Sequence, residues 1–214
     1  MKNNSILQYF KNQRKELASY INPNACRVLE IGCGVGNFKS NFKYKIEYWG
    51  IEPNKNAAKI AGKNAYKIFS DSYENVYQSL PNSYFDLIIC NDVIEHMVDF
   101  DFFFKTIKSK MVKGGFIIGS VPNVRFYQNL IKLIFFRDWK YEDEGILDKT
   151  HLKFFTRKSL ISIFRNHDFK IIDINGINSI SIKDSITKYP LKVTICFFLG
   201  FDSKYKQIAF KISK

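Results

Sequence analysis

Two acids and a histidine occur close together in the run Asp92-Val93-Ile94-Glu95-His96. If this run is the first turn of a helix, Asp92, Glu95 and His96 lie at positions i, i+3 and i+4 and share one face. Two oxygen ligands and one imidazole suit Mg²⁺ or Mn²⁺ better than a closed structural zinc site. His151 would be a fourth ligand in this hypothesis. In the alternative hypothesis, His96 or His151 is a general base that takes a proton from a reacting group.

A second group of residues with chemical meaning is the turn 32–36, whose sequence is Gly-Cys-Gly-Val-Gly. Glycine lets the backbone turn sharply after a strand and lets a ligand approach the main chain closely. Glu30 stands before the first glycine, where it can answer a cationic group, and Glu52 follows the next predicted strand, where a carboxylate can accept both hydroxyls of a ribose. A dinucleotide-binding turn would have glycine in place of Asn37. The pattern predicts a cofactor site of another kind; an ordinary strand–helix turn is the structural alternative.

These residues need a sheet to position them, and the hydrophobic pattern predicts one. Short β-rich runs alternate with helical runs from Arg27 onward, and runs such as Leu87-Ile88-Ile89 are continuously apolar, as in strands covered on both faces. This alternation predicts an α/β fold with a doubly wound, Rossmann-like sheet. The predicted strands are 27–31, 47–51, 65–69, 85–90, 116–120, 169–175 and 207–212, and the predicted helices between the early strands are 38–41, 55–64, 73–80 and 98–111.

Two segments lie outside this pattern. Residues 6–21 predict an amphipathic helix before the first strand. The connection 123–156 is long for a compact fold; we expect it to contain a helix at 126–136 and to form a lid over the substrate. The expected organisation is a single domain, 1–214, with an N-terminal helix (1–22), a cofactor-binding half (23–121), a lid insertion (122–156) and a C-terminal helix and strands (157–214).

The charge and the cysteines narrow the partners and the compartment. The 214 residues carry a net charge of +13, which suits a phosphorylated or otherwise anionic small molecule. Lysine and arginine are scattered and not clustered, which argues against a nucleic-acid partner and favours a solubilising surface. The four cysteines form no C-x-x-C pair, which favours reduced thiols in a cytoplasmic protein. The apolar run 193–201 is too short to span a bilayer and could serve as a core or homodimer contact.

The residues around the glycine turn carry a family resemblance. Residues 28–36 resemble motif I of the class I S-adenosylmethionine-dependent methyltransferases, residues 50–53 resemble their motif II, and 85–90 resemble their fourth strand. The resemblance extends from about Cys26 to the end of the chain and implies a seven-stranded sheet with an antiparallel last strand. It implies that the cofactor is bound by Glu30, Gly32, Cys33, Gly34, Gly36, Glu52, Pro53, Asp71 and Asn91. Within that set Asp71 would bond the adenine amino group and Asn91 would face the methionine part, although Asp71 could instead cap the helix 73–80.

Two further resemblances concern the acceptor. The run 92–96 is similar to one in ubiquinone-biosynthesis O-methyltransferases and in small-RNA 3′-terminal 2′-O-methyltransferases, where acids and histidines hold a divalent metal over a diol. Many related methyltransferases carry the acid–histidine pair without a metal. The stretch 145–157 resembles bacterial methyltransferases found with surface-polysaccharide genes, which implies sugars or nucleotide-linked precursors as acceptors.

The expected function is therefore O-methylation of a small polar acceptor, such as a sugar or a nucleotide-linked or phosphorylated glycan precursor. The alternatives are a metal-dependent RNA 2′-O-methyltransferase and a non-catalytic partner subunit that binds the cofactor. Transfer to a hydroxyl requires a base or a metal that removes its proton.

Overall fold

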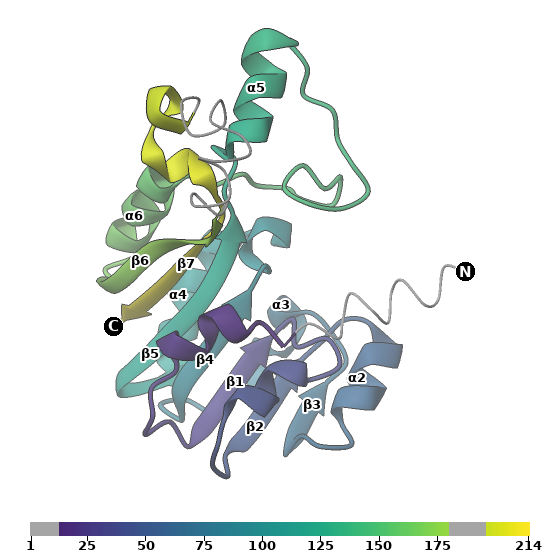
Figure 1. Ribbon diagram of the computed structural model, residues 1–214. Coiled ribbons are helices and arrows are strands. Elements are labelled where there is room, and N and C mark those ends of the chain that lie inside the picture. The colour runs from purple at the N-terminus through teal and green to yellow at the C-terminus, as the bar shows by residue number, and fades with distance from the viewer. Residues whose placement is uncertain (1–12, 180–195) are drawn as a thin grey trace.

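The computed structural model describes residues 13–179 and 196–214, and its centre is a seven-stranded sheet (Figure 1). The strand order is β3-β2-β1-β4-β5-β7-β6. Neighbouring strands from β3 to β5 are parallel, whereas β7 runs antiparallel to both β5 and β6. The strands are β1 (Arg27–Ile31), β2 (Glu47–Ile51), β3 (Lys67–Phe69), β4 (Phe85–Asn91), β5 (Met111–Pro122), β6 (Lys170–Ser179) and β7 (Tyr205–Ser213). The predicted α/β sheet with an antiparallel last strand is confirmed.

The central strand β4 explains why the sheet forms in this order. Leu87, Ile88, Ile89 and Cys90 are fully buried. Ile88 and Cys90 belong to one apolar cluster, and Leu87 and Ile89 belong to another. Because alternate residues of a strand point to opposite faces, the two clusters cover the two faces of the sheet. A strand with this pattern needs a neighbour on each side, and β4 has β1 and β5.

The helices lie close to their predicted positions and differ mainly at their ends. The α-helices are α2 (Lys55–Ala61), α3 (Tyr73–Val76), α4 (Phe100–Ile107), α5 (Tyr127–Phe135) and α6 (Arg157–Asn166). Short 3-10 helices are η1 (Lys15–Tyr20), η2 (Asn37–Asn41), η3 (Tyr77–Ser79), η4 (Ile94–His96), η5 (Lys108–Lys110) and η6 (Phe201–Lys204). Helix α4 begins later than predicted because the side chain of Asp99 caps it by accepting from the N–H of Phe102 at 2.8 Å. Of the predicted helix 6–21, residues 6–12 lie outside the described residues, and 15–20 form η1.

The connection from β5 to α6 leaves the sheet and returns to it. Its helix α5 stands apart from the sheet in Figure 1, close to the predicted 126–136. Its first residues pack on Cys196 from the chain just before η6. The connection returns to the carboxyl end of β4, where the N–H groups of Leu152 and Lys153 donate to the carbonyl oxygen of Glu95 at 2.8 and 3.1 Å. Within the described ranges we find no helix with the length and apolar character needed to cross a membrane.

Candidate active site

The glycine turn follows β1 directly, and its backbone shape explains its composition. The three glycines of the turn 32–36 have φ values of 67°, 54° and 80°, in the left-handed region that favours glycine. A Cβ atom on Gly32 would lie 2.5 Å from Cγ2 of Val93, so a side chain has no room there. The N–H groups of Gly32 and Cys33 both donate to the carbonyl oxygen of Ile51, at 2.8 and 3.1 Å. These bonds fix the turn against the end of β2.

Glu52 follows β2 and is held rigidly beside the turn. Its side chain is buried, and its two carboxylate oxygens accept from the backbone N–H groups of Gly34 and Asn54, each at 2.8 Å. An ionised carboxylate has about four acceptor positions. Because the two bonds occupy one position on each oxygen, both oxygens can still accept from a ligand. Glu52 is thus placed to bind a pair of hydroxyl groups.

Glu30 is the second buried acid of this region, at the end of β1. It is 4% exposed, and the hydroxyl of Tyr48 donates a hydrogen bond to it. Burial raises the pKa of the Glu30 carboxyl to about 8, and the nearby charge of Glu52 acts in the same direction. A positively charged group bound beside Glu30 would favour its ionised form and would be favoured in return.

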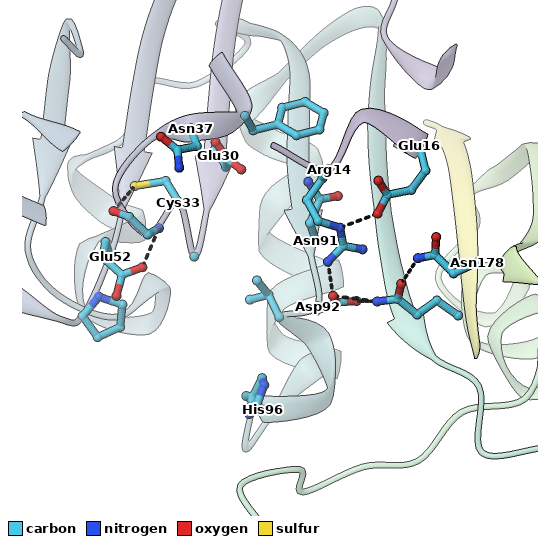
Figure 2. Close-up of a pocket in the computed structure, with 16 residues that line it drawn as sticks. Arg14, Glu16, Glu30, Cys33, Asn37, Glu52, Asn91, Asp92, His96 and Asn178 are labelled. Atoms are coloured by element: carbon cyan, nitrogen blue, oxygen red, sulfur yellow. Dashed lines mark hydrogen bonds and ion pairs between the residues drawn. The ribbon is translucent and has the colours of Figure 1, made fainter. Parts of the chain in front are cut away.

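The turn and both acids border a cavity of about 640 Å³ (Figure 2). Its lining comes from the carboxyl ends of β1, β2 and β4, together with residues before β1 and on β6 and β7. The residues are Arg14, Glu16, Glu30, Gly32, Cys33, Gly34, Asn37, Phe38, Glu52, Pro53, Asn91, Asp92, Val93, His96, Asn178 and Gln207. All the residues predicted to bind the cofactor are among them except Gly36 and Asp71. Open α/β sheets bind ligands at this edge.

Asn91, the last residue of β4, has an unusual position in this cavity. Both polar atoms of its side-chain amide are buried, and neither has a hydrogen-bond partner within residues 13–179 and 196–214. Buried polar atoms without partners are costly. Because the same side chain lines the cavity, a bound ligand with a donor and an acceptor would complete it.

Asp92 is not where the helical hypothesis expected it. Its backbone is left-handed, with φ of 52°, and the helical turn that follows is the short 3-10 helix η4. The carboxylate therefore points away from the face of Glu95 and His96. It is bound by the guanidinium of Arg14, by the hydroxyl of Ser120 at 2.8 Å and by the amide of Gln207 at 2.7 and 2.8 Å. The expectation that Asp92 shares one helix face with the other two residues is wrong.

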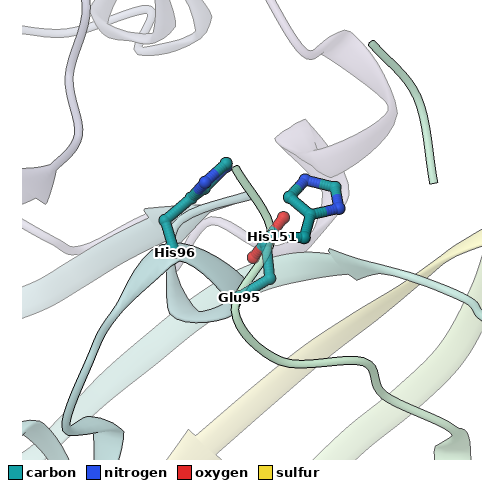
Figure 3. Close-up of side chains that lie close together, drawn as sticks. All are labelled: Glu95, His96 and His151. Atoms are coloured by element: carbon teal, nitrogen blue, oxygen red, sulfur yellow. The ribbon is translucent and has the colours of Figure 1, made fainter. Parts of the chain in front are cut away.

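The structure does bring together three of the four predicted ligands, Glu95, His96 and His151 (Figure 3). One possible ligand atom from each lies within 4.8 Å of the others. Glu95 is fully buried and His151 nearly so, and the two imidazole rings meet edge to face with centroids 4.7 Å apart. Of the three, only His96 lines the cavity. Burial lowers the pKa of His96, so its ring is neutral near pH 7.

Comparison with known proteins identifies the family to which the chain belongs. The family described as "Methyltransferase domain" matches residues 4–174. The chain belongs to this methyltransferase family. The ubiquinone biosynthesis O-methyltransferase of Bradyrhizobium diazoefficiens is 27% identical over 101 residues, which are 45% of this chain and 40% of that protein.

Solved structures of methyltransferases have the same fold. A SAM-dependent methyltransferase from Archaeoglobus fulgidus superposes with a TM-score of 0.69 at 21% identity, over 93% of this chain and 91% of that one. An S-adenosylmethionine-dependent methyltransferase from Mesorhizobium loti gives a TM-score of 0.65 at 15% identity, over 93% and 96% of the two chains. The recognition of the class I methyltransferase fold from the sequence is confirmed.

The residues of this methyltransferase fit S-adenosylmethionine, the methyl donor of the family. The donor carries a ribose diol, an ammonium group and a carboxylate. The free acceptor positions of Glu52 suit the diol, the buried carboxyl of Glu30 suits a cation, and the unpartnered amide of Asn91 can both donate and accept. The assignment of these three residues to the cofactor stays a prediction.

Asp71 and His167 do not line the cavity. Asp71, in the methyltransferase's turn after β3, is exposed and accepts at 2.7 Å from the N–H of Ser72 and from the side chain of Asn75. Neither donor is a backbone N–H of α3, whose N-cap residue is Ser72, so the alternative that Asp71 caps this helix is wrong. The contact of Asp71 with adenine stays a prediction. The side chain of His167 is largely buried, and its Nε2 lies 2.7 Å from a carboxylate oxygen of Asp101.

The residues that bind Asp92 could not be predicted from sequence patterns. Arg14 precedes the first strand and Gln207 lies on the last strand, so nothing in their local patterns connects them. They meet because β7 inserts antiparallel beside β5 and η1 packs against β7. Signals of this kind exist only in the tertiary structure.

Proposed function

We propose that this chain transfers the methyl group of S-adenosylmethionine to a hydroxyl of a small polar acceptor, such as a sugar or a nucleotide-linked or phosphorylated glycan precursor. The observation that carries the proposal is that one cavity is bordered by both the glycine turn with Glu52 and the imidazole of His96. The first can hold the methyl donor. His96 lines the part of the same cavity where an acceptor would meet the methyl group.

Methyl transfer is an in-line displacement, and the sulfonium of the donor is already activated. The protein then contributes mainly by holding the two reactants in line. A hydroxyl must also lose its proton as it attacks, and this requires a base or a metal ion. We assign this task to the group Glu95, His96 and His151, because its neutral imidazole at the cavity can receive a proton or bind an ion.

The polarity of the cavity supports a polar acceptor. On the side away from the glycine turn the lining includes Arg14, Glu16, Asn178 and Gln207, which offer both donors and acceptors. The net charge of +13 favours an acceptor that carries phosphate. We further propose that the connection 122–156 acts as the lid of the acceptor site, since its residue His151 belongs to the group that would deprotonate the acceptor.

The relative from Bradyrhizobium diazoefficiens supports oxygen as the methylated atom, because that protein is named an O-methyltransferase. Its match covers 40% of its length, so its own acceptor is not transferred to this chain. The polar residues that line the cavity instead support an acceptor with several hydrogen-bonding groups.

The test combines binding and turnover. Calorimetric titration with S-adenosylmethionine and S-adenosylhomocysteine should give one site per chain. Transfer of a tritiated methyl group should then occur to members of a panel of nucleotide sugars and sugar phosphates, and not to short RNAs that end in a 2′,3′-diol. Failure to bind either cofactor would overturn the whole proposal.

Two other results would replace it with one of the alternatives. Methylation of RNA alone, with affinity that falls steeply as salt increases, would establish the RNA alternative. Tight cofactor binding without turnover on any acceptor would favour the partner subunit.

A further inference from the structure

The orientation of the two histidines at the acceptor side is fixed by backbone carbonyl groups. Nδ1 of His96 lies 3.1 Å from the carbonyl oxygen of Thr150, and Nδ1 of His151 lies 3.0 Å from that of Ile146. A carbonyl oxygen can only accept, so each Nδ1 carries the proton. Each Nε2 therefore keeps its lone pair. Histidines that bind metals are commonly oriented in this way, with the second ring nitrogen donating to a carbonyl group.

The third member of the group is a carboxylate with no donor to satisfy it. Glu95 is fully buried, and neither of its side-chain oxygens has a hydrogen-bond partner among the described residues. Figure 3 shows this side chain close to both imidazole rings. Three groups that can donate electron pairs thus converge.

We propose that Glu95, His96 and His151 form a three-ligand site for a divalent first-row transition-metal ion such as Mn²⁺, Fe²⁺, Co²⁺ or Zn²⁺, with its remaining coordination positions open toward the cavity. The ligand atoms lie within 4.8 Å of one another, so small side-chain rotations bring them to a common ion. The inference rests on the proposed function only for the use of the ion, which when bound would make an acceptor hydroxyl more acidic. The binding site itself follows from the geometry.

The identity of the ion follows from the loss of Asp92 from the ligand set. With Asp92 the site would have two carboxylates and would suit Mg²⁺, which prefers oxygen ligands. The carboxylate of Asp92 is instead bound by Arg14, Ser120 and Gln207. Two imidazoles and one carboxylate remain, and imidazole selects transition metals over Mg²⁺. This departs from the Mg²⁺ or Mn²⁺ that the sequence suggested.

A simpler role for the histidines does not account for Glu95. In an acid–histidine pair that works as a base, the carboxylate accepts a hydrogen bond from the imidazole and orients it. Here both imidazoles are oriented by carbonyl groups, and the carboxylate accepts from neither. The buried acid would then serve no purpose, whereas a metal ion would use it.

The experiment measures metal binding directly, on the whole chain and without cofactor or acceptor. Protein treated with a chelator is titrated with Mn²⁺, Co²⁺, Zn²⁺ and Mg²⁺ by calorimetry, and Co²⁺ binding is followed through its visible absorption. We expect one Mn²⁺, Co²⁺ or Zn²⁺ per chain and at least tenfold weaker binding of Mg²⁺. Glu95→Gln and His151→Ala should each weaken Co²⁺ binding by about tenfold or more, since changes even beyond the direct ligands commonly cost 10- to 100-fold.

The matched control is His167→Ala, which removes a histidine that contacts an acid elsewhere in the fold and should leave Co²⁺ affinity unchanged. Circular dichroism of each variant establishes that it is folded; if His151→Ala does not fold, Glu95→Gln, which keeps the shape of the side chain, decides. Absence of a saturable site, equal affinity for Mg²⁺, or Co²⁺ binding that neither variant weakens would overturn the inference.

The result separates from that of the proposed function. Methyl transfer that persists after chelation, with no metal bound, would refute the metal site and leave the methyltransferase proposal intact. A saturable Co²⁺ site in a protein that does not bind S-adenosylmethionine would do the reverse.

Discussion

The two sides of the cavity are built in different ways. The cofactor side, meaning the turn 32–36 and Glu52, joins the ends of two neighbouring strands through backbone hydrogen bonds. The acceptor side, meaning Glu95, His96 and His151, joins the end of β4 to a connection in which Thr150 lies 54 residues after its partner His96. The first arrangement is local and the second depends on a long-range contact.

The two sides also differ in how far their polar groups are satisfied. Both oxygens of Glu52 have backbone donors, whereas both oxygens of Glu95 have no partner within the described ranges. A satisfied, rigid group is ready to bind before its ligand arrives. An unsatisfied buried carboxylate needs a ligand to be stable. We infer that the turn 32–36 and Glu52 are preformed, whereas Glu95 on the acceptor side, like the amide of Asn91 on the cofactor side, is completed by what the site binds.

The largest effect should come from Glu52→Ala. The substitution leaves the N–H groups of Gly34 and Asn54 without acceptors and removes the acceptor for the ribose. A hydrogen bond to a charged group contributes about 1.5–3 kcal/mol, so the loss of two to a ligand implies a decrease of about 100-fold or more in affinity for S-adenosylmethionine. Calorimetry measures it, with the exposed acid in Glu144→Ala as the control. An affinity within tenfold of the wild type would remove Glu52 from the cofactor site.

Gly32→Ala should destabilise the protein by about 3 kcal/mol. A left-handed φ costs a non-glycine residue about 1–2 kcal/mol, and the new Cβ would also meet Val93 at 2.5 Å. The control is Gly114→Ala, because Gly114 has φ of 79° and nothing within 4 Å of its Cβ position. The difference between the two variants in urea denaturation isolates the contact with Val93. Equal losses would mean that the turn adapts and that the cofactor side is less rigid than its hydrogen bonds indicate.

The contrast between the two sides also explains what the sequence could predict. The turn 32–36 was predictable because its chemistry is local: glycine conformations, a preceding strand and an acid after the next strand. The strands were predictable for the same reason, since an apolar run such as 87–89 specifies its own environment. Their ends were less so, and β5 begins five residues before the predicted 116 because Met111 still pairs with Phe85.

The acceptor side was predictable in composition and not in geometry. Sequence spacing placed Asp92 with Glu95 and His96, on the assumption of a regular helix. The left-handed backbone of Asp92 ends that regularity, and its partner Arg14 comes from a distant part of the chain. A single-residue conformation and a long-range ion pair leave no periodic signal, so this part of the site had to come from the structure.

Glu30→Gln tests whether the buried acid of the cofactor side is neutral until a cation binds. The folded-state pKa of about 8 lies above that of an unfolded chain, near 4.5, so the native state binds more protons between these values. The wild type should therefore lose stability as pH rises from about 4.5 to 8. Because glutamine cannot ionise, the variant should lack this loss and be more stable at pH 8, by about 2 kcal/mol after allowance for relaxation around the charge.

Urea denaturation at pH 5 and pH 8 measures the difference, and Tyr48 can still donate to the amide oxygen of the variant. S-adenosylmethionine should reverse the order, because its ammonium group stabilises an ionised Glu30 and not a glutamine. Parallel stability curves for the two proteins between pH 5 and 8 would contradict a raised pKa at this position.

The smallest effect should come from the ion pair of Arg14 and Asp92. Asp92→Asn keeps the size of the side chain and removes the charge that faces Arg14, whose side chain is 14% exposed, against 19% for Asp92. We expect a loss of about 1–2 kcal/mol in the free energy of unfolding, less than for a fully buried pair because both groups retain some contact with water and hydrogen bonds to neighbours. The exposed pair Lys149–Asp143 gives the control, and Asp143→Asn should change nothing measurable.

A double-mutant cycle with Arg14→Met isolates the energy of the interaction between Arg14 and Asp92. Co²⁺ affinity measured on the same Asp92→Asn protein should equal that of the wild type. A weakened Co²⁺ site would mean that Asp92 reaches the ion after all, and the three-ligand set would then have to give way to the four ligands that the spacing first suggested.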